Sequence, residues 1–339
     1  MLNIGRKKVF IYGSSAGLGD ALMLLPSLLE LCKNDKFEIT ISLTHRTRHL
    51  KEVLNFYLNL VPNNLIFKTI SVQNGFIGRL KYFLKLRNER FDYVYFPTSK
   101  SNLKTLLVLL IIMPKFLFVC IKSILLDPQN NEHKISYYSR KFGLNFSGTQ
   151  LEKILCNLRI RSNDLYSKPE ISSKIDHVVI APGGGVLELH KRWPISKFVA
   201  LIVNLKIKKN LNSILLGGPD QLELLKEIQK KCDAKGVNCI LSHPKSILES
   251  ISILNSSKCL VSSCSSAIHM GSLTGIKIIG LYGPTDFKLT GPWNDSFEIK
   301  SITCHCGPAT KTYFGRDKPL CMNKITVESV FETVSMHYE

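Results

Sequence analysis

The sequence predicts an α/β protein made of two Rossmann-like domains, each a doubly wound parallel sheet. Three observations favour this fold class. The chain has 339 residues, which is enough for two domains of ordinary size. Hydrophobic residues make up 45% of the chain, so each domain can bury a core. In both halves, short apolar runs alternate with helical segments, and this alternation is typical of parallel sheets covered by helices.

The first half of the chain begins with a regular alternation of strands and helices. The predicted strands are 9–12, 37–43, 65–70 and 91–96, and the predicted helices are 21–32, 49–58 and 79–88. In the first of these helices, leucines from Leu22 to Leu29 recur at the 3.6-residue spacing of one buried face. A glycine-containing turn, 13–20, joins the first strand to this helix.

The most apolar stretch, 103–126, is expected to lie inside the protein and not across a membrane. Pro114, Lys115 and Lys122 interrupt it, whereas a membrane-spanning helix needs about 20 apolar residues with few charges. We predict a buried helix over 103–113 and a strand over 116–120. Residues 1–12 lack the apolar core of a secretory signal, which predicts a cytoplasmic protein whose ten cysteines are thiols or ligands.

The alternation resumes after a polar segment, 162–174, which we interpret as an interdomain linker. The predicted strands are 177–181, 213–216, 239–241, 259–262 and 277–282, and the predicted helices are 195–208, 221–232, 246–255, a short helix carrying His269, and 327–337. We therefore expect domains over 1–165 and 170–326. The remaining residues, 327–339, are expected to pack back on the N-terminal domain. Two facing domains of this kind bind ligands in the central cleft between them.

The charge balance favours an anionic partner. The chain has 45 basic and 26 acidic residues, a net charge of +19. This balance predicts attraction to a membrane surface, a phosphorylated glycan, a nucleotide or a nucleic acid, or it reflects only a lysine-rich surface. Nucleic acid is not the expected partner, because no compact basic helix or interleaved aromatic motif accompanies the charge.

The segment 258–286 carries the most informative motif. It reads as strand, polar turn, helix and strand, and ligands of open α/β sheets bind at the carboxyl ends of such strands. The turn 263–266 lies at a helix start, where backbone N–H groups and the helix dipole favour a phosphate. His269, in this helix, is either a ligand or a hydrogen-bonded core histidine. Cys264 stands where an acidic residue was expected.

Two further turns follow predicted strands. Gly17-Leu18-Gly19-Asp20 does not match the dinucleotide-binding fingerprint, and Asp20 is either a helix cap or a general base. Pro182-Gly183-Gly184-Gly185, with Lys191 close by, suits a diphosphate. The alternative is a flexible loop beside solvated charges, and we favour the diphosphate because the glycines and Lys191 flank the same strand end.

A cysteine cluster near the C-terminus has part of a metal-binding pattern. Cys304, Cys306 and Cys321 supply three sulfur atoms, and His305 or Cys264 is a candidate fourth ligand. A structural zinc site needs four ligands, commonly with Cys-x₂-Cys spacing. We therefore expect thiols here and no metal.

Taken in order, these motifs resemble glycosyltransferase family 9, the ADP-heptose:lipopolysaccharide heptosyltransferases, over nearly the whole chain. The resemblance is carried by Gly17-Leu18-Gly19-Asp20, Pro182-Gly183-Gly184 with Lys191-Arg192-Trp193-Pro194, Leu216-Gly217-Gly218-Pro219, 263–269 with Leu281-Tyr282-Gly283-Pro284-Thr285-Asp286, and the cysteine-containing tail from Cys304 to Met322. The family's Asp-Thr-Gly turn reads Cys264-Ser265-Ser266 here, which leaves the donor sugar open between heptose, a modified heptose and a hexose.

The resemblance implies a GT-B fold and an inverting, metal-independent transfer with no cofactor. The domain 1–165 would bind the acceptor and 170–326 the nucleotide-sugar donor, ADP-heptose. Asp20 would be the general base and Lys191 would neutralise the departing diphosphate. The donor-binding residues carried over are Gly17, Gly19, Gly183, Gly184, Lys191, Asp220, Cys264, Ser265, Ser266 and His269.

The acceptor implied by the resemblance is an anionic lipid-linked glycan such as the lipopolysaccharide core. The enzyme would then work in the cytoplasm, peripherally on the inner-membrane surface. Two alternatives stay open. One is a transferase that modifies proteins and holds a metal on its cysteines. The other is a non-catalytic nucleotide-sugar-binding protein, which the residue at position 264 motivates.

Overall fold

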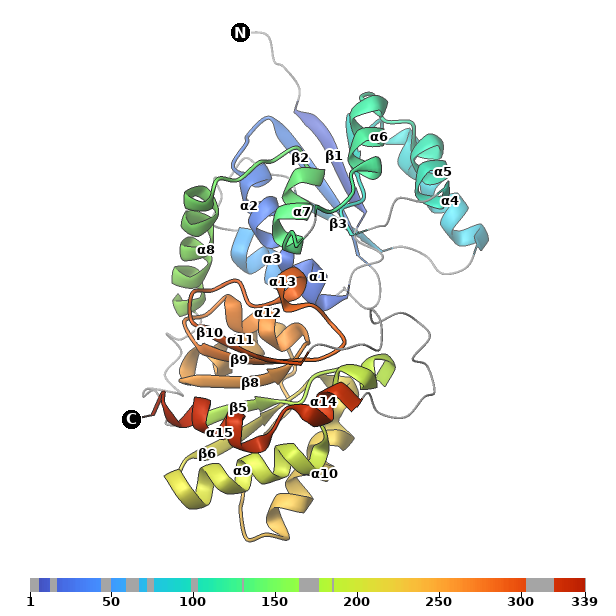
Figure 1. Ribbon diagram of the computed structural model, residues 1–339. Coiled ribbons are helices and arrows are strands. Elements are labelled where there is room, and N and C mark those ends of the chain that lie inside the picture. Colours follow the sequence, from blue (N-terminus) through green and yellow to red (C-terminus); the bar gives the residue numbers. More distant parts are fainter. Residues whose placement is uncertain are drawn as a thin grey trace. The chain divides into compact units, whose positions relative to one another are not determined.

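The protein is described here from a computed structural model (Figure 1). The structure describes residues 6–12, 17–43, 50–58, 67–71, 76–98, 103–129, 131–164, 177–184, 186–302 and 320–338. The chain divides into two compact units, Met1–Ile154 and Leu155–Glu339. Each unit holds one parallel sheet with helices, as the alternation predicted. Most of the predicted linker, from residue 165 onward, lies outside the described residues.

The N-terminal unit has a four-stranded parallel sheet in the order β3-β2-β1-β4. Its strands are β1 (Lys7–Tyr12), β2 (Phe37–Leu43), β3 (Phe67–Ser71) and β4 (Tyr93–Tyr95), and its helices include α1 (Leu18–Met23), α2 (Leu25–Cys32), α3 (Leu50–Leu58) and α4 (Phe76–Asn88). In β1, Val9 pairs with Ile39 of β2 on one side and Tyr93 of β4 on the other. The strand order therefore reverses beside β1, and such switch points are where open sheets bind ligands.

Two N-terminal predictions need correction. The helix predicted over 21–32 is two helices, because α1 stops before Leu24 and Pro26 occupies the first turn of α2, where its missing N–H costs least. The strand predicted over 116–120 is wrong, because those residues belong largely to the helix α6 (Leu117–Leu125). Its buried residues Cys120 and Ile124 are four apart, which is a helical spacing.

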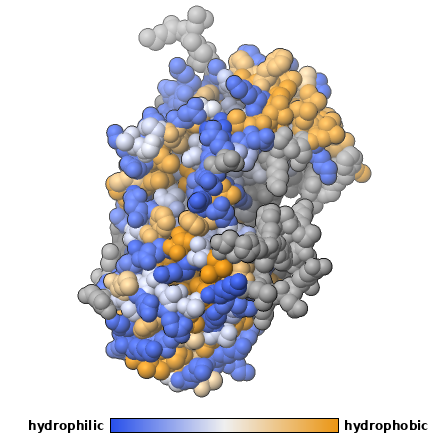
Figure 2. Space-filling view, in the orientation of Figure 1, coloured by the Kyte–Doolittle hydropathy of each residue, from blue (hydrophilic) through white to orange (hydrophobic). Residues whose placement is uncertain are grey.

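The helix predicted over 103–113 exists as α5 (Leu103–Ile112) but is not buried all round. Leu103 is 71% exposed, and only Thr105, Leu109 and Ile112 are buried on this helix. Figure 2 shows hydrophobic residues gathered at the surface over this part of the unit. Two further helices, α7 (Lys134–Lys141) and α8 (Gly148–Asn163), were not predicted.

The C-terminal unit has a six-stranded parallel sheet in the order β10-β9-β8-β5-β6-β7. Its strands are β5 (His177–Ala181), β6 (Asn212–Leu216), β7 (Ile240–Ser242), β8 (Cys259–Ser263), β9 (Lys277–Tyr282) and β10 (Phe297–Ser301). Its α-helices are α9 (Ile195–Lys209), α10 (Leu222–Asp233), α11 (Ile247–Ser256), α12 (Ser266–Ser272), α13 (Phe287–Thr290), α14 (Leu320–Lys324) and α15 (Val327–Ser335). The five strands predicted here are confirmed, whereas β10 was not predicted.

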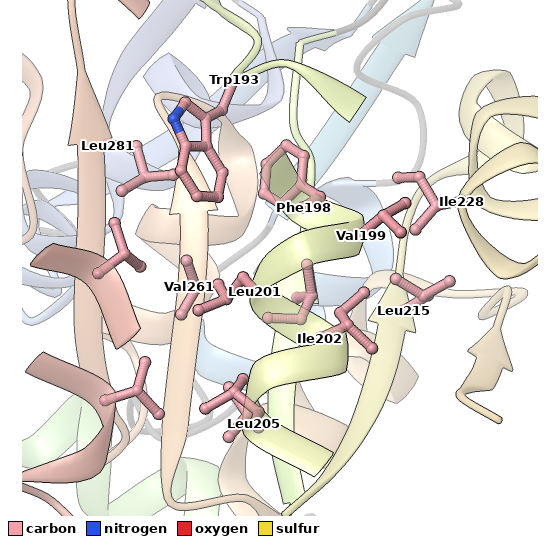
Figure 3. Packing of buried hydrophobic residues seen from close by; sticks show 14 of the residues in the cluster. Trp193, Phe198, Val199, Leu201, Ile202, Leu205, Leu215, Ile228, Val261 and Leu281 are labelled. Atoms are coloured by element: carbon pink, nitrogen blue, oxygen red, sulfur yellow. The ribbon is translucent and has the colours of Figure 1, made fainter. Parts of the chain in front are cut away.

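The core of this unit forms around α9 and the sheet (Figure 3). Trp193 is fully buried against Phe198, and its indole N–H donates to the backbone oxygen of Ile325 at 3.1 Å. Val330 and Val334 of α15 belong to the same cluster. The C-terminal helix, predicted to pack on the N-terminal domain, thus packs on α9 and β9 of its own unit.

Candidate functional site

The glycine turn after β5 and the serine turn after β8 touch each other. β5 and β8 are neighbours in the sheet, with Ala181 paired to Ser262, and the strand order reverses between them. Gly183 has φ +67°, and a methyl group placed on it would lie 2.9 Å from Cβ of Ser265. The structure therefore brings two sequence motifs, about eighty residues apart, together at the switch point of the sheet.

Replacing Gly183 with alanine is expected to destabilise the C-terminal unit. The new methyl group would meet Ser265, in addition to the strain of a positive φ at a non-glycine residue. Gly236→Ala is the matched control, because Gly236 has φ +73° and a methyl group added there would have nothing within 4 Å. We expect Gly183→Ala to lower the free energy of unfolding by about 1–3 kcal/mol more than Gly236→Ala does, the usual cost of overpacking. Denaturant titration measures both values, and equal losses would contradict the close contact.

The Lys191-Arg192-Trp193-Pro194 segment fixes the glycine turn from the other side. The Arg192 guanidinium donates to the carbonyl oxygens of Gly183 at 3.1 Å and Gly184 at 2.5 Å. The backbone N–H of Trp193 donates to Oγ of Ser263 at 3.1 Å. Burial lowers the pKa of Arg192, and the Asp220 carboxylate opposes this shift. Arg192 and Trp193 therefore hold the two turns in place.

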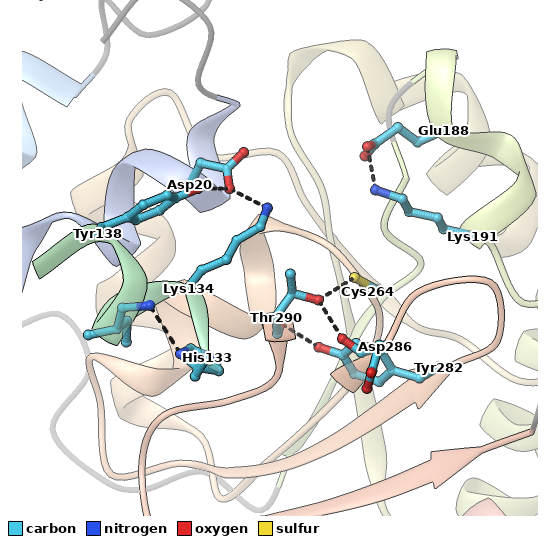
Figure 4. Close-up of polar contacts among 11 residues, drawn as sticks. Asp20, His133, Lys134, Tyr138, Glu188, Lys191, Cys264, Tyr282, Asp286 and Thr290 are labelled. Carbon is cyan, nitrogen blue, oxygen red and sulfur yellow. Dashed lines mark hydrogen bonds and ion pairs between the residues drawn. The ribbon is translucent and has the colours of Figure 1, made fainter. Parts of the chain in front are cut away.

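Lys191, from the same segment, reaches a different partner. Its Nζ lies 2.5 Å from Oε1 of Glu188, three residues earlier in a short 3-10 helix, and its side chain is 17% exposed (Figure 4). The ammonium group of Lys191 is therefore paired with a carboxylate.

The third turn, after β6, also reaches the glycine turn. The side-chain amide of Gln221 donates to the Gly184 oxygen at 3.5 Å, and its carbonyl accepts from the backbone of Gly218 at 3.0 Å. Asp220, next to Gln221, is exposed. Three of the predicted donor-binding segments thus lie at one edge of the C-terminal sheet.

The serine turn begins α12 and leads to His269. Ser265 is the N-cap, and its Oγ accepts from the backbone N–H of Ala267 at 3.3 Å. His269 is buried, and its Nδ1 accepts from the indole N–H of Trp293 at 3.2 Å. The imidazole is therefore a hydrogen-bonded histidine of the core. Trp293 was not among the predicted residues, although its place after Gly291-Pro292, close behind the Gly-Pro-Thr-Asp motif, was a signal.

Cys264 lies against α13 and β9. It is buried, and its Sγ is 3.9 Å from Oγ1 of Thr290 (Figure 4). The hydroxyl of Tyr282 donates to the Thr290 oxygen at 2.9 Å, and Asp286 caps α13. Burial and then the neighbouring Cys264 raise the pKa of Tyr282 well above its usual range. The thiol therefore occupies a packed position beside neutral polar groups.

In the N-terminal unit, Asp20 lies in the first turn of α1, the helix that follows β1 in the chain. Its Oδ1 accepts from Nζ of Lys134 at 2.7 Å and from the hydroxyl of Tyr138 at 2.7 Å (Figure 4). Gly17 is the N-cap of this helix. The carboxylate that the sequence singled out is thus held by two side chains from α7.

The two partners of Asp20 were missed by sequence reasoning. Lys134 and Tyr138 are four apart on α7, so they share a face of the helix. Tyr138 is buried, and burial together with the negative charge of Asp20 raises its pKa well above its usual range. The phenol therefore stays protonated and donates to the carboxylate. A Lys-x-x-x-Tyr pair was the available signal, but the helix itself was not predicted.

The metal candidates Cys304 and Cys306 lie outside the described residues. Cys321 is buried in the core, and a methyl group on Gly283 would lie 2.9 Å from its Sγ. Among the residues that the structure describes, no three potential ligands gather into a metal site. Within the same residues, no helix has the length and apolar character needed to cross a bilayer.

Comparison with known proteins identifies relatives of the whole chain. The family model of glycosyltransferase family 9 (heptosyltransferase) matches residues 139–314. Lipooligosaccharide heptosyltransferase 2 of Campylobacter jejuni is 23% identical to this chain. The alignment covers 96% of this chain and 98% of that protein.

Solved structures show the same fold. Escherichia coli ADP-heptose lipopolysaccharide heptosyltransferase II matches with a TM-score of 0.65 at 16% identity, over 97% of this chain and 98% of that one. A glycosyltransferase family 9 protein of Veillonella parvula matches with a TM-score of 0.66 at 17% identity, over 99% of this chain and 98% of that chain. These likenesses confirm the predicted GT-B fold.

Proposed function

Because the chain belongs to glycosyltransferase family 9 and is therefore a glycosyltransferase, we propose that it moves heptose from ADP-heptose to a lipopolysaccharide core or related lipid-linked glycan, with inversion and without a metal. The observation that carries the proposal is the meeting of the glycine and serine turns at the β5/β8 switch point, beside Lys191. The heptosyltransferase from Campylobacter jejuni, which aligns with nearly the whole chain, supports the choice of sugar.

The donor diphosphate is proposed to bind at this edge of the C-terminal sheet. Arg192 holds the carbonyl of Gly183, and in a trans peptide the N–H of Gly184 points the opposite way. That N–H, the start of α12 at Ser265 and Ser266, and Lys191 are groups suited to phosphate oxygens. We propose that the diphosphate replaces Glu188 as the partner of Lys191. His269 supports the site by fixing α12 against Trp293.

The acceptor is proposed to react with the help of Asp20. The carboxylate takes the proton of the acceptor hydroxyl while that oxygen forms a bond to the anomeric carbon. The bond from the anomeric carbon to the diphosphate breaks on the opposite face, and ADP leaves with the bonding electron pair. Stabilising this charge with protein groups lowers the barrier of such a transfer. The domain 1–165 is then the acceptor domain, and 170–326 is the donor domain.

Tyr138→Phe is expected to lower kcat by roughly tenfold. This factor corresponds to the free energy of one hydrogen bond to a charged group. Without the phenol, the Asp20 carboxylate loses one of the two contacts that orient it. Tyr137→Phe is the matched control on the same helix, because the Tyr137 hydroxyl donates to the backbone oxygen of Leu126. Steady-state kinetics with varied donor should show KM for the donor unchanged in both variants. An unchanged kcat in Tyr138→Phe would argue against this positioning role.

The proposed function is tested by screening donors and then acceptors. A thermal-shift series over ADP-, GDP- and UDP-sugars should single out the ADP-sugar, because a ligand of the folded state raises the melting temperature. ADP release is then measured with ADP-heptose and lipid-linked core acceptors. Binding of ADP-heptose without release of ADP with any acceptor would favour a non-catalytic nucleotide-sugar-binding protein. Release from another ADP-sugar alone would replace heptose in the proposal.

The proposed acceptor also implies a location. A lipid-linked glycan stays in the bilayer, so the enzyme is proposed to work peripherally at the cytoplasmic face of the inner membrane. The net charge of +19 supports contact with anionic lipid and with a phosphorylated acceptor.

A further inference from the structure

Exposed apolar side chains are concentrated on three consecutive helices of the N-terminal unit. In the part of the chain that the structure describes, sixteen large hydrophobic residues are exposed, and ten of them lie between Ile77 and Leu125. These ten belong to α4, α5, α6 and the residue that follows α5. Scattered exposed hydrophobic residues are normal, but a contiguous group of this kind marks an interaction surface.

The middle helix, α5, is apolar on both sides. Its outer stripe contains Leu103, Leu107 and Leu110, at the spacing of i, i+4 and i+7, and all three are exposed. Its inner stripe includes Leu109 and Ile112, which are buried in the unit's core. A helix that is hydrophobic all round has a second apolar environment to contact.

The flanking helices continue the outer stripe. On α4, Ile77, Leu80 and Leu84 are exposed at i, i+3 and i+7. On α6, Phe118 is 88% exposed, and Leu125 is exposed two turns further along the same stripe. The helix α5 packs on both α4 and α6, so the three stripes belong to one surface. Figure 2 shows the hydrophobic atoms gathered over these helices. We name this surface the α4–α6 face.

Positive charge accompanies the α4–α6 face. Residues 76–126 contain nine lysines and arginines but only two acids, Glu89 and Asp92. Lys81, Lys104 and Lys122 are exposed on α4, α5 and α6, and Lys122 lies between Phe118 and Leu125 in the stripe of α6. Long basic side chains let their apolar stems lie along a hydrophobic layer while the ammonium groups reach phosphate groups.

The length of these helices decides how they meet a bilayer. The ten residues of α5 span about 15 Å, half of the roughly 30 Å of hydrocarbon in a membrane. Such a helix lies in the interfacial layer and does not cross it. We propose that the α4–α6 face inserts into the interface of a bilayer that contains anionic phospholipids. This deepens the membrane contact proposed above, and it rests on the exposed stripes and their charge.

The test is binding to vesicles. The protein is sedimented with vesicles of phosphatidylethanolamine and phosphatidylglycerol, and with vesicles of phosphatidylcholine alone. We expect binding to the anionic vesicles that weakens with salt, and weaker binding to the neutral ones. The double variant Leu107→Ser/Phe118→Ser should bind the anionic vesicles at least about tenfold more weakly, because each change removes a large apolar side chain.

The control variant is Ile207→Ser/Phe297→Ser, which removes two exposed hydrophobic residues of the C-terminal unit. It should bind vesicles like the parent, and both variants should keep the parent's melting temperature and its thermal shift with ADP. The proposal is overturned if the parent protein does not sediment with anionic vesicles, or if both double variants lose vesicle binding equally. It is also overturned if Leu107→Ser/Phe118→Ser changes the oligomeric state, measured by light scattering, and not the vesicle binding; the face would then contact a second copy. Vesicle binding without any ADP release would refute the proposed transfer and leave this inference standing.

Discussion

Asp20→Asn is expected to lower kcat by about 10²–10⁴-fold, the usual contribution of a general base. Asparagine keeps the size of the side chain and an oxygen that accepts from Lys134 and Tyr138, so the surroundings of the site are preserved. It cannot take a proton from the acceptor hydroxyl. The loss should therefore appear in kcat, while the binding of ADP-heptose stays the same.

The measurement is single-turnover transfer with saturating donor, together with donor affinity by calorimetry. Asp35→Asn is the control, because Asp35 is an exposed carboxylate of the same unit. A variant at position 20 that transfers as fast as the parent would remove Asp20 from the chemistry. A variant that fails to bind donor would instead assign Asp20 a structural role.

Lys191→Met is expected to lower kcat by about 10²–10³-fold, comparable to the loss of one group that stabilises transition-state charge. Methionine retains the apolar stem but has no charge to neutralise the departing diphosphate. Lys226→Met is the matched control, because Lys226 also pairs with a glutamate three residues earlier, Glu223, but on the exposed surface of α10.

The rate of ADP formation distinguishes these two lysine variants. Lys226→Met should match the parent. Lys191→Met should lose more rate than donor affinity, because the negative charge on the diphosphate grows as the glycosidic bond breaks. If Lys191→Met lost only donor affinity and kept its rate at saturation, the lysine would bind the ground state and the transition state equally.

The fold was predictable because parallel strands buried on both faces form short apolar runs, as in Val178–Ala181 and Cys259–Val261. The prediction of a strand over 116–120 was wrong because it relied on the same kind of short apolar run. A five-residue apolar run fits a buried strand and a helix segment equally well, and only the contacts of Cys120 and Ile124 with the core decide between them. Likewise, an apolar helix such as α5 looks the same in sequence whether its outer leucines are buried or exposed.

The candidate site was predictable where its residues follow strands. The carboxyl ends of neighbouring parallel strands lie at one edge, so Gly183 and Ser265 had to be close once β5 and β8 were adjacent. The partners of Asp20 were not predictable in this way. Lys134 and Tyr138 are more than a hundred residues from it in the chain, and no local pattern links them to a carboxylate.

At position 264 the sequence left the donor sugar open, because cysteine stands where the family has an aspartate. The packing around Cys264 bears on that choice. An aspartate there would place a negative charge in a buried position beside Thr290 and the protonated hydroxyl of Tyr282. The cysteine fits the same space without charge. We therefore expect the donor preference of this chain to differ from relatives with an acid at that turn, and the donor screen described above measures it.

Heptosyl transfer itself is tested by mass spectrometry of a lipid-linked core acceptor after incubation with the protein and ADP-heptose. We expect the acceptor to gain the mass of one heptosyl residue, with an equal amount of ADP formed. The gain should be slowed strongly by Asp20→Asn and by Lys191→Met, and hardly at all by Asp35→Asn and Lys226→Met. An acceptor of unchanged mass, with ADP-heptose bound but intact, would contradict heptosyl transfer by this protein.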